Sequence, residues 1–586
     1  MACAVLMRPR MRSLSLVGLL LLSSSLALFG CDDTTTSDES NVTSVVKEET
    51  PEAQALRALL NDRATSFDVL RAGGVTSSPA KALLAYRDGP DGVANTEDDN
   101  LFDTVAEVDD VKGVGPATIK SLVKLADAKG YVAAEKAKTR SVIFSPQPAS
   151  ESHNREVARI IGQAERSIDV AMYSYSDAGI GAALDAAVDR GVKVRFLFQT
   201  ASADKKLSGS QLQSSRSGKL EAMGVDVRWV NKIMHHKFMI VDGPRDDAAA
   251  ASTATIVSGS GNWSNGAATV YDENTLFMTG YPELTLRLQM DFNLLWEHST
   301  DLVANPALVF EPSSLLITEE TIPRNPGMHV FFTSDNFKVN GTTFSVTNKN
   351  TISDELVRAI EGAEERIHVA SGHLRSRPVA HAIIAKMAED PGIDVMIYTD
   401  GQEYIADSTN AQQKASQEAC LAKATTDSQE RACVDKSYLY GRDLEIAGAN
   451  VRYKYYAYRW DASYAAQMHN KFLIIDDRLY TGSYNLSDNA EHNTFENMFM
   501  FDGPEFRDLV ETYEAKFQAM WTTGEGLLPA LREKIETQST IPIVFDAMAL
   551  TWKEVRDLKS LIAAECPDVN SAEFRQNAPS HKTCTK

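Results

Sequence analysis

The chain has few cysteines and lacks the residue spacings that hold zinc. It contains 6 cysteines among 586 residues, with no Cys-x-x-Cys pair and no His/Cys cluster at zinc spacing. Residues 141–525 also contain no cluster of acidic residues or histidines with metal-ligand spacing. We therefore expect no zinc finger, and neither a metal nor another cofactor in the catalytic part of the protein.

Basic residues are also scarce. The chain has 59 Lys and Arg against 80 Asp and Glu, a net charge of -21. Such a charge opposes non-specific binding to polyanions such as DNA or anionic lipid, although it does not forbid a locally basic cleft. The composition is otherwise that of a soluble globular protein, and the length indicates several domains.

The only long apolar run lies at the amino terminus, in a segment with the features of a targeting sequence. Arg8, Arg10 and Arg12 precede the run 14–29, which is short for a spanning helix and suits a signal peptide over residues 1–30. The sequence 28–31 resembles a bacterial lipoprotein processing site, which implies that Cys31 is lipidated; the alternative is an ordinary secretory signal. Residues 31–50 are polar and predict a flexible tether. We expect an exported protein of the bacterial cell envelope, anchored in a membrane through this lipid.

Export makes the remaining cysteines informative. Four follow Cys31, at Cys420, Cys433, Cys566 and Cys584, and an even number in an oxidising compartment predicts disulfides. The simplest pairing is local, Cys420 with Cys433 and Cys566 with Cys584. The alternative is four buried free thiols.

One motif occurs twice. His235 and Lys237 precede four apolar residues and Asp242, and His469 and Lys471 precede the same pattern ending at Asp476. The apolar runs predict buried strands, and residues two apart on a strand face the same side. Each histidine therefore lies beside a fixed cation, an arrangement suited to an anionic substrate.

The sequence after each copy repeats as well. Gly-Ser-x-Asn follows at 259–262 and at 482–485, and Glu-Asn follows at 273–274 and at 496–497. This doubled order resembles the phospholipase D superfamily over about residues 141–525, and a doubled motif of this length rarely arises by chance. The resemblance implies phosphodiester cleavage by two histidines on opposite sides of the phosphorus, through a phosphohistidine.

The resemblance also implies a role for each site residue. His235 is the nucleophile and His469 the general acid, although the residues alone do not decide which histidine attacks first. Lys237 and Lys471 hold the phosphate oxygens, and Glu273 and Glu496 orient the histidines. Further donors to the phosphate are Ser260, Asn262, Ser483 and Asn485. Asp242 and Asp476, at the strand ends, are expected to be structural partners.

Strand and helix patterns alternate through this part of the chain, which predicts an α/β fold. We expect two fused α/β/α repeats, residues 141–300 and 327–525, that form one pseudo-twofold catalytic unit. Residues 301–326 are the predicted linker, and residues 526–586 a carboxyl-terminal extension with a helix near 550–564.

Residues 51–137 predict a small all-α domain. The stretch 111–120, with Gly113 and Gly115, resembles the helix-hairpin-helix motif, which in that family holds a nucleic-acid phosphate. Residues 51–130 carry nine Lys and Arg against thirteen Asp and Glu, whereas a DNA-binding module is normally basic. We therefore favour a spacer or protein-contact module. The acidic loop 88–99 is read as solvated rather than as a calcium site.

These observations favour a phospholipid substrate, hydrolysed to phosphatidic acid and a head-group alcohol. The alternative is an exported nuclease, for which nucleic acid is the partner; no obligate protein partner is evident. The family also contains cardiolipin synthases, but these carry membrane helices near the amino terminus.

The insertion 401–440 is expected to shape the substrate entrance, and the aromatic stretch 453–460 predicts either a lipid-contacting rim or buried packing.

Overall fold

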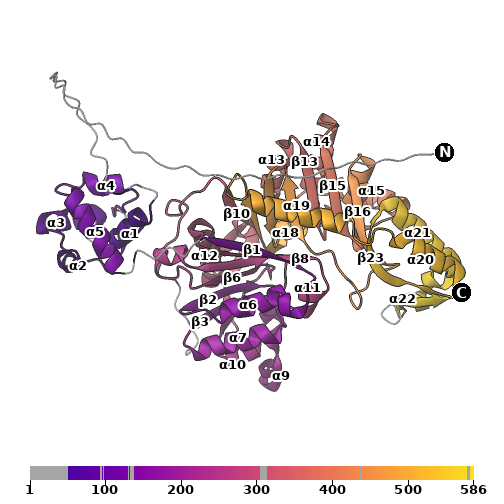
Figure 1. The fold of residues 1–586 in the computed structure, drawn as a ribbon, viewed down its shortest axis with the longest axis horizontal. Helices are drawn as coiled ribbons and strands as arrows, with labels where there is room; N and C mark the ends of the chain where they lie inside the picture. The colour runs from indigo at the N-terminus through magenta and orange to yellow at the C-terminus, as the bar shows by residue number, and fades with distance from the viewer. Residues whose placement is uncertain are drawn as a thin grey trace, which may run out of the picture. The chain divides into compact units, whose positions relative to one another are not determined.

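A computed structural model describes Val46 and residues 50–92, 96, 98–129, 131, 138–303, 313–434, 437–576 and 581–586. The predicted signal peptide, most of the tether and Cys31 lie outside the described residues. Two α/β repeats follow a helical segment (Figure 1). Within the described part of the chain, no helix is both long enough and apolar enough to cross a membrane.

The amino-terminal segment is all-α, as predicted, and has a core of its own. Gly74 and Gly113, at φ of +86° and +90°, let the chain turn between α2 and α3 and between α4 and α5. The helices are α1 (Pro51–Asn61), α2 (Phe67–Ala72), α3 (Ser77–Arg87), α4 (Val105–Asp110) and α5 (Pro116–Ala128).

The acidic loop after α3 is held by an arginine. Arg63 contacts Asp88 and Asp99 at 2.6 Å each, and the hydroxyl of Thr96 donates to Asp98 at 2.7 Å. Among the residues that the structure describes, no three His, Cys, Asp or Glu side chains gather where they would hold a metal ion. Arg63 thus neutralises two carboxylates of this loop, Asp88 and Asp99.

The first repeat contains an eight-stranded sheet of order β1-β8-β7-β6-β2-β3-β4-β9. Its strands are β1 (Thr139–Ser145), β2 (Ser167–Met172), β3 (Lys193–Phe198), β4 (Asp226–Trp229), β6 (Lys237–Val241), β7 (Thr255–Gly259), β8 (Glu273–Thr279) and β9 (Thr300–Asp301). Its helices are α6 (His153–Ile161), α7 (Ala178–Asp189), α8 (Ala201–Asp204), α9 (Gly209–Ser214), α10 (Arg216–Ala222), α11 (Asn265–Thr269) and α12 (Pro282–Glu297). Helices α6, α7 and α10 cover one face of this sheet (Figure 1).

The second repeat has the same topology, in the order β10-β21-β18-β17-β13-β15-β16-β23. Its strands are β10 (Met328–Phe332), β13 (Arg366–Ser371), β15 (Asp394–Asp400), β16 (Asn450–Ala457), β17 (Lys471–Ile475), β18 (Arg478–Gly482), β21 (Asn497–Phe501) and β23 (Val544–Thr551). Its helices are α13 (Thr351–Glu361), α14 (Arg377–Glu389), α17 (Tyr440–Ile446), α18 (Asp488–Asn493) and α19 (Arg507–Trp521). The predicted fold class, two α/β/α repeats in one unit, is therefore confirmed.

One hydrophobic core joins the repeats. It contains β6 and β17 residues Phe238, Ile240, Phe472 and Ile474, together with side chains of α12 and α19. Each motif strand is buried along its whole length, because one face meets this shared core and the other meets the helices of its own repeat. This explains the unbroken apolar runs that follow each His-x-Lys.

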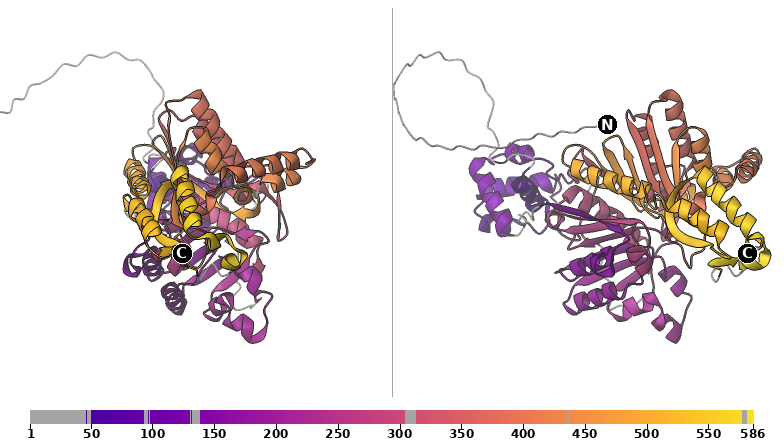
Figure 2. Two further views of the ribbon diagram at one scale, coloured as in Figure 1. Left: turned by 90° about the vertical axis from the view of Figure 1, so that its right-hand side faces the viewer. Right: turned by 45° about the vertical axis from the view of Figure 1, so that its right-hand side comes forward.

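The residues after 525 complete the second sheet. Strand β23 pairs antiparallel with β16, and helix α21 (Trp552–Glu565) packs on both strands (Figure 2). The extension also contains α20 (Leu527–Thr537) and α22 (Ala572–Gln576). The disulfides Cys420–Cys433 and Cys566–Cys584 are both present, as predicted. The first links α15 (Asp407–Leu421) to α16 (Asp427–Val434) in the insertion.

Equivalent positions of β2 and β13 carry opposite charges. Asp169 forms ion pairs with Arg195 at 2.6 Å and with Arg245 at 2.5 Å. Burial alone would raise the pKa of Asp169, but the two guanidinium groups hold this pKa well below its usual range. His368 lies between Glu514 and Asp394, at 3.0 and 3.1 Å. Burial alone would lower the pKa of His368, but these two carboxylates outweigh it and raise the pKa.

We expect this histidine to make stability depend on pH. A raised pKa in the folded state stabilises the protein below the unfolded value of about 6.5, and this contribution is lost as pH rises through the folded pKa. The difference in melting temperature between the wild type and His368→Gln should therefore be largest at pH 6 and shrink towards pH 9. A difference that grows with pH would contradict the assignment.

Candidate active site

Short parallel strand pairings connect the residues before each His-x-Lys motif to the other repeat. β5 (Ile233–Met234), just before His235, pairs with β20 (Thr494–Phe495) of the second repeat, and Met468 forms a matching bridge to Asp272 of the first. The His235 amide donates to the Phe495 carbonyl at 3.1 Å, and the His469 amide donates to the Asp272 carbonyl at 2.9 Å. Both histidines therefore lie where the repeats meet.

Each histidine is held by the glutamate of the other repeat. Nδ1 of His235 lies 2.7 Å from Oε1 of Glu496, and Nδ1 of His469 lies 2.7 Å from Oε1 of Glu273. A Nδ1–H that donates to a carboxylate leaves Nε2 as the free, reactive nitrogen. The predicted orienting role of the glutamates is thus matched by the geometry, with the partners exchanged between repeats.

The two serines of the Gly-Ser-x-Asn sequences bond to the Glu-Asn doublets. The Ser483 hydroxyl donates to Oε2 of Glu496 at 2.7 Å and accepts the Asn497 amide at 3.0 Å. The Ser260 hydroxyl accepts the Asn274 amide at 2.9 Å. Both hydroxyls are completely buried and already engaged. In this geometry Ser483 supports the carboxylate of Glu496, and Ser260 supports the backbone beside Glu273; their role as phosphate donors stays a prediction.

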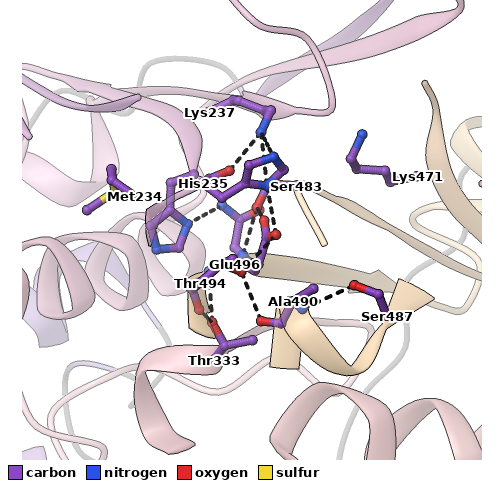
Figure 3. Close-up of polar contacts among 12 residues, drawn as sticks. Met234, His235, Lys237, Thr333, Lys471, Ser483, Ser487, Ala490, Thr494 and Glu496 are labelled. Carbon is purple, nitrogen blue, oxygen red and sulfur yellow. Dashed lines mark hydrogen bonds and ion pairs between the residues drawn. The ribbon is translucent and has the colours of Figure 1, made fainter. Parts of the chain in front are cut away.

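The two lysines reach the site from opposite strands. Nζ of Lys237 donates to the His235 carbonyl at 2.8 Å, and Nζ of Lys471 donates to the His469 carbonyl at 2.8 Å. Each ammonium lies 3.2–3.3 Å from the ring nitrogens of the histidine two residues earlier. Figure 3 shows Lys237 and Lys471 approaching from different ribbons, beside His235 and Glu496. Two cations and two imidazoles thus share one small space.

Burial makes every ionisable group of this site unusual. It lowers the pKa of both His235 and His469 well below the ordinary value, an effect increased by the neighbouring lysines. It raises the pKa of Glu273 and of Glu496 to about 7, and lowers the pKa of Lys237 to about 7 and of Lys471 to about 8. An arriving phosphate anion favours the protonated forms of the lysines and histidines, because it supplies the missing opposite charge.

The two asparagines of the Gly-Ser-x-Asn sequences have spare hydrogen-bonding capacity. Within the described chain, Oδ1 of Asn262 and Oδ1 of Asn485 are buried and have no hydrogen-bond partner. Rotating an amide by 180° exchanges its oxygen for an NH₂ donor. The two amides are therefore suited to a phosphate oxygen, as the sequence predicted.

Asp242 and Asp476 lie away from the chemistry, at the far ends of β6 and β17. Asp242 accepts the amides of residues 165–167, and Asp476 accepts those of residues 364–366, at 2.7–3.2 Å. Both residues adopt positive φ, 53° and 52°. Their carboxylates fix the turn before β2 and β13, which agrees with the expected structural role.

Sequence reasoning missed the residues between each His and Lys. The Asn274 side chain donates to Asn470 at 3.0 Å, and the Asn497 side chain donates to His236 at 3.0 Å. All four side chains are completely buried. The repeated Glu-Asn doublet was the available signal: its glutamate holds the catalytic histidine of the other repeat, and its asparagine holds the neighbouring residue.

The pseudo-twofold symmetry breaks at the edge of the site. The Tyr173 ring lies 4.6 Å from that of His235, and Lys237 lies over it at 5.2 Å. The equivalent residue of the second repeat is Gly372, where a Cβ would meet the Met468 carbonyl at 2.5 Å. His373 follows it and contacts Glu403 at 3.3 Å. The His235 side has an aromatic wall, whereas the His469 side has none at this position.

Comparison with known proteins agrees with this geometry. A family model described as "Cardiolipin synthase, PLD-like domain" matches residues 157–296 and 356–521, just over half of the chain. Mitochondrial cardiolipin hydrolase of Mus musculus is 31% identical over 152 residues, which are 26% of this chain and 61% of the relative. The human hydrolase is 30% identical over 152 residues, 26% of this chain and 53% of the relative. The chain thus spans about three fifths or less of the length of these relatives.

Solved structures show weaker likeness. Nuc from Salmonella typhimurium, a phospholipase D family member, is 24% identical with a TM-score of 0.22, over 28% of this chain and 97% of that chain. Phosphatidylserine synthase from Haemophilus influenzae is 12% identical with a TM-score of 0.43, over 75% of this chain and 94% of that chain.

The exchanged pairing gives a direct prediction. Glu273→Gln should change the NMR signals and pKa of His469 and leave those of His235 nearly unchanged, and Glu496→Gln should do the reverse. Each substitution should lower kcat by about 10²–10⁴-fold, since a misoriented imidazole offers the wrong nitrogen. Labelled histidine spectra identify the ring that responds. A response of His235 to Glu273→Gln alone would contradict the exchange.

Proposed function

The chain belongs to the phospholipase D superfamily, and on that premise we propose that it hydrolyses a phospholipid to phosphatidic acid and a head-group alcohol. The observation that carries this is the pair of histidines, each held through Nδ1 by the opposite repeat's glutamate at 2.7 Å, with a lysine beside each of them. Two oriented imidazoles provide an attacking nitrogen and a proton donor for one phosphodiester.

The reaction has two steps. Nε2 of the first histidine attacks phosphorus, the bond from phosphorus to the head-group oxygen breaks, and the second histidine gives its proton to that oxygen. The second histidine then takes a proton from water, the water oxygen attacks phosphorus, and the bond to the first histidine breaks. Lys237, Lys471 and the amides of Asn262 and Asn485 stabilise the charge on the phosphate oxygens.

We assign His235 as the nucleophile and His469 as the proton donor, the order that the resemblance to the superfamily implies. Glu496, the partner of His235, accepts from Ser483 at 2.7 Å and from Thr494 at 3.1 Å. The pKa of Glu273, the partner of His469, is raised to about 7, as is that of Glu496, so the basicity of the two carboxylates does not by itself distinguish the histidines.

A lipid substrate agrees with the relatives, which are named for cardiolipin, and with the overall charge of -21. A chain of this charge gains little counterion-release affinity for a nucleic acid. We also propose export to the cell envelope and anchoring through Cys31, which would concentrate the enzyme at its substrate.

Transfer to an alcohol instead of water is the second candidate, because the matching family model is described as a cardiolipin synthase domain. Water and a lipid alcohol would compete for the same phosphohistidine. Adding glycerol during turnover distinguishes them: hydrolysis alone yields phosphatidic acid, whereas transfer yields phosphatidylglycerol in proportion to the glycerol present.

We expect measurable phospholipid hydrolysis that exceeds DNA cleavage at matched salt and survives EDTA. A panel of phosphatidylglycerol, cardiolipin, phosphatidylcholine, single- and double-stranded DNA and a chromogenic phosphodiester tests this. His235→Asn and His469→Asn should each abolish turnover, without further loss in the double variant. Trapped phosphoenzyme should map to His235.

The same panel decides against the proposal if DNA is the best substrate. Deleting residues 51–137 then shows whether the helical domain grips DNA, because DNA cleavage would fall steeply without it. Lipid turnover that is indifferent to the deletion supports a spacer or contact role for that domain.

The pH dependence should be narrow. The glutamates, with pKa raised to about 7, must be ionised, and Lys237 and Lys471, with pKa lowered to about 7 and about 8, must be protonated to hold phosphate. For the chromogenic diester, kcat/KM should therefore peak near pH 7 and fall on both sides, with limbs that belong to the coupled set of groups. Lys237→Arg should move the alkaline limb upward, because arginine stays protonated. A flat profile from pH 6 to 9 would refute this.

A further inference from the structure

A cavity of about 340 Å³ opens beside the second repeat's half of the active site. It lies at the ends of β15 and β16, against α21 of the carboxyl-terminal extension. The residues that line it are Gly401, Gln402, Tyr404, Tyr455, Tyr456, Ala457, Tyr458, Arg459, Trp460 and Lys559. Of the two alternatives for the aromatic stretch 453–460, buried packing holds for its tyrosines. Three of these tyrosines line this cavity.

Two hydrogen bonds connect the cavity wall to Met468, the residue before the catalytic His469. Tyr456, in the cavity wall, donates its hydroxyl to Asp400 at 3.3 Å. Asp400 accepts the Met468 amide at 2.8 Å, and Met468 directly precedes His469. The cavity therefore lies on the side of His469, the residue suited to protonate the leaving group.

The charge of the cavity is opposite to that of the chain. Lys559 and Arg459 line it, and the described lining residues include no carboxylate. Nζ of Lys559 lies 4.4 Å from the centre of the Tyr458 ring and donates to the Tyr458 carbonyl at 2.7 Å. An ammonium has three N–H donors, so two remain for a ligand. Burial lowers the pKa of Lys559 to about 8, a cost that a bound anion offsets.

The nearby carboxylates are neutralised elsewhere. Glu403 receives Arg375 at 2.5 Å and His373 at 3.3 Å. Burial raises the pKa of Asp400 to about 7. Neither carboxylate offsets the two cations that face the cavity.

We propose that this cavity is the head-group subsite, and that it selects lipids whose head group is a polyol with a second anionic group, such as a second phosphate. The leaving group of the reaction is the head group, and it departs on the side of His469. The aromatic faces suit the C–H surface of a polyol, and the two cations suit an anion. A choline or ethanolamine head group would place its own cation beside Lys559. This inference rests on the proposed function.

Lys559→Met tests the subsite with a matched control. Methionine keeps the apolar stem among the tyrosines and removes the charge, whereas Lys553→Met removes an exposed lysine of the same helix. For phosphatidylglycerol phosphate, Lys559→Met should raise KM by about 10-fold or more, the worth of a charge-assisted hydrogen bond. KM for phosphatidylglycerol and for the chromogenic diester should change by less than about twofold, as should all three in Lys553→Met. An equal loss on every substrate, or no loss on any, would overturn the proposal.

Calorimetric titration with glycerol 3-phosphate separates this inference from the proposed function. The wild type should bind two equivalents, one at the histidine pair and one in the cavity, and Lys559→Met should bind one. If the wild type binds two but cleaves no lipid, the subsite stands as a site for a free polyol phosphate and its head-group role fails with the proposed function. If the wild type cleaves lipid and Lys559→Met binds as the wild type does, only the subsite is refuted.

Discussion

The site depends on two contacts of 2.7 Å between a histidine of one repeat and a glutamate of the other: a hydrogen bond between His469 and Glu273, and an ion pair between His235 and Glu496. Because the partners are exchanged, neither repeat contains an oriented histidine by itself. The parallel pairing of β5 with β20, and the matching bridge between Asp272 and Met468, hold the donors and acceptors in register. Fusion of the repeats around one hydrophobic core is thus a condition for catalysis, since separating them would leave two buried carboxylates without partners.

Burial then sets the chemistry. It moves the pKa values of the glutamates, lysines and histidines away from their ordinary values. The pKa values of the glutamates and lysines come to lie at about 7 to 8, so these groups can gain or lose a proton in response to the charge of a bound phosphate. The chain supplies two ammonium groups where the phosphate charge develops. The chain as a whole carries a net charge of -21. The space between the catalytic lysines and the cavity around Lys559 are two places where positively charged side chains gather.

The repeats are equivalent in topology but not in the surroundings of their histidines. Glu496 accepts two hydroxyl donors, while Oε2 of Glu273 has none within the described chain. Tyr173 stands beside His235, while Gly372 leaves the equivalent position empty of a side chain. Such differences give unequal surroundings to two histidines that the motif alone leaves interchangeable.

Much of this was predictable from the sequence. Apolar runs identified the motif strands, because buried strands need apolar residues on both faces, and the doubled His-x-Lys identified the catalytic groups. The exchange of glutamates was not predictable, since Glu273 follows His235 along the chain and yet binds His469. The sequence also left open whether the tyrosines at the end of β16 are buried, because α21 packs on β16 and no local pattern reveals that docking site. The contacts of Ser260 and Ser483 could not be predicted either, because a hydroxyl suits a phosphate, a carboxylate or a backbone amide equally well.

A crystal structure of the protein with vanadate bound would test the central claim most directly. The account predicts one vanadium atom between Nε2 of His235 and Nε2 of His469, with Lys237 and Lys471 on its equatorial oxygens and the two exchanged glutamate contacts intact. Vanadate held by the histidine and glutamate of a single repeat, or bound away from either histidine, would contradict it.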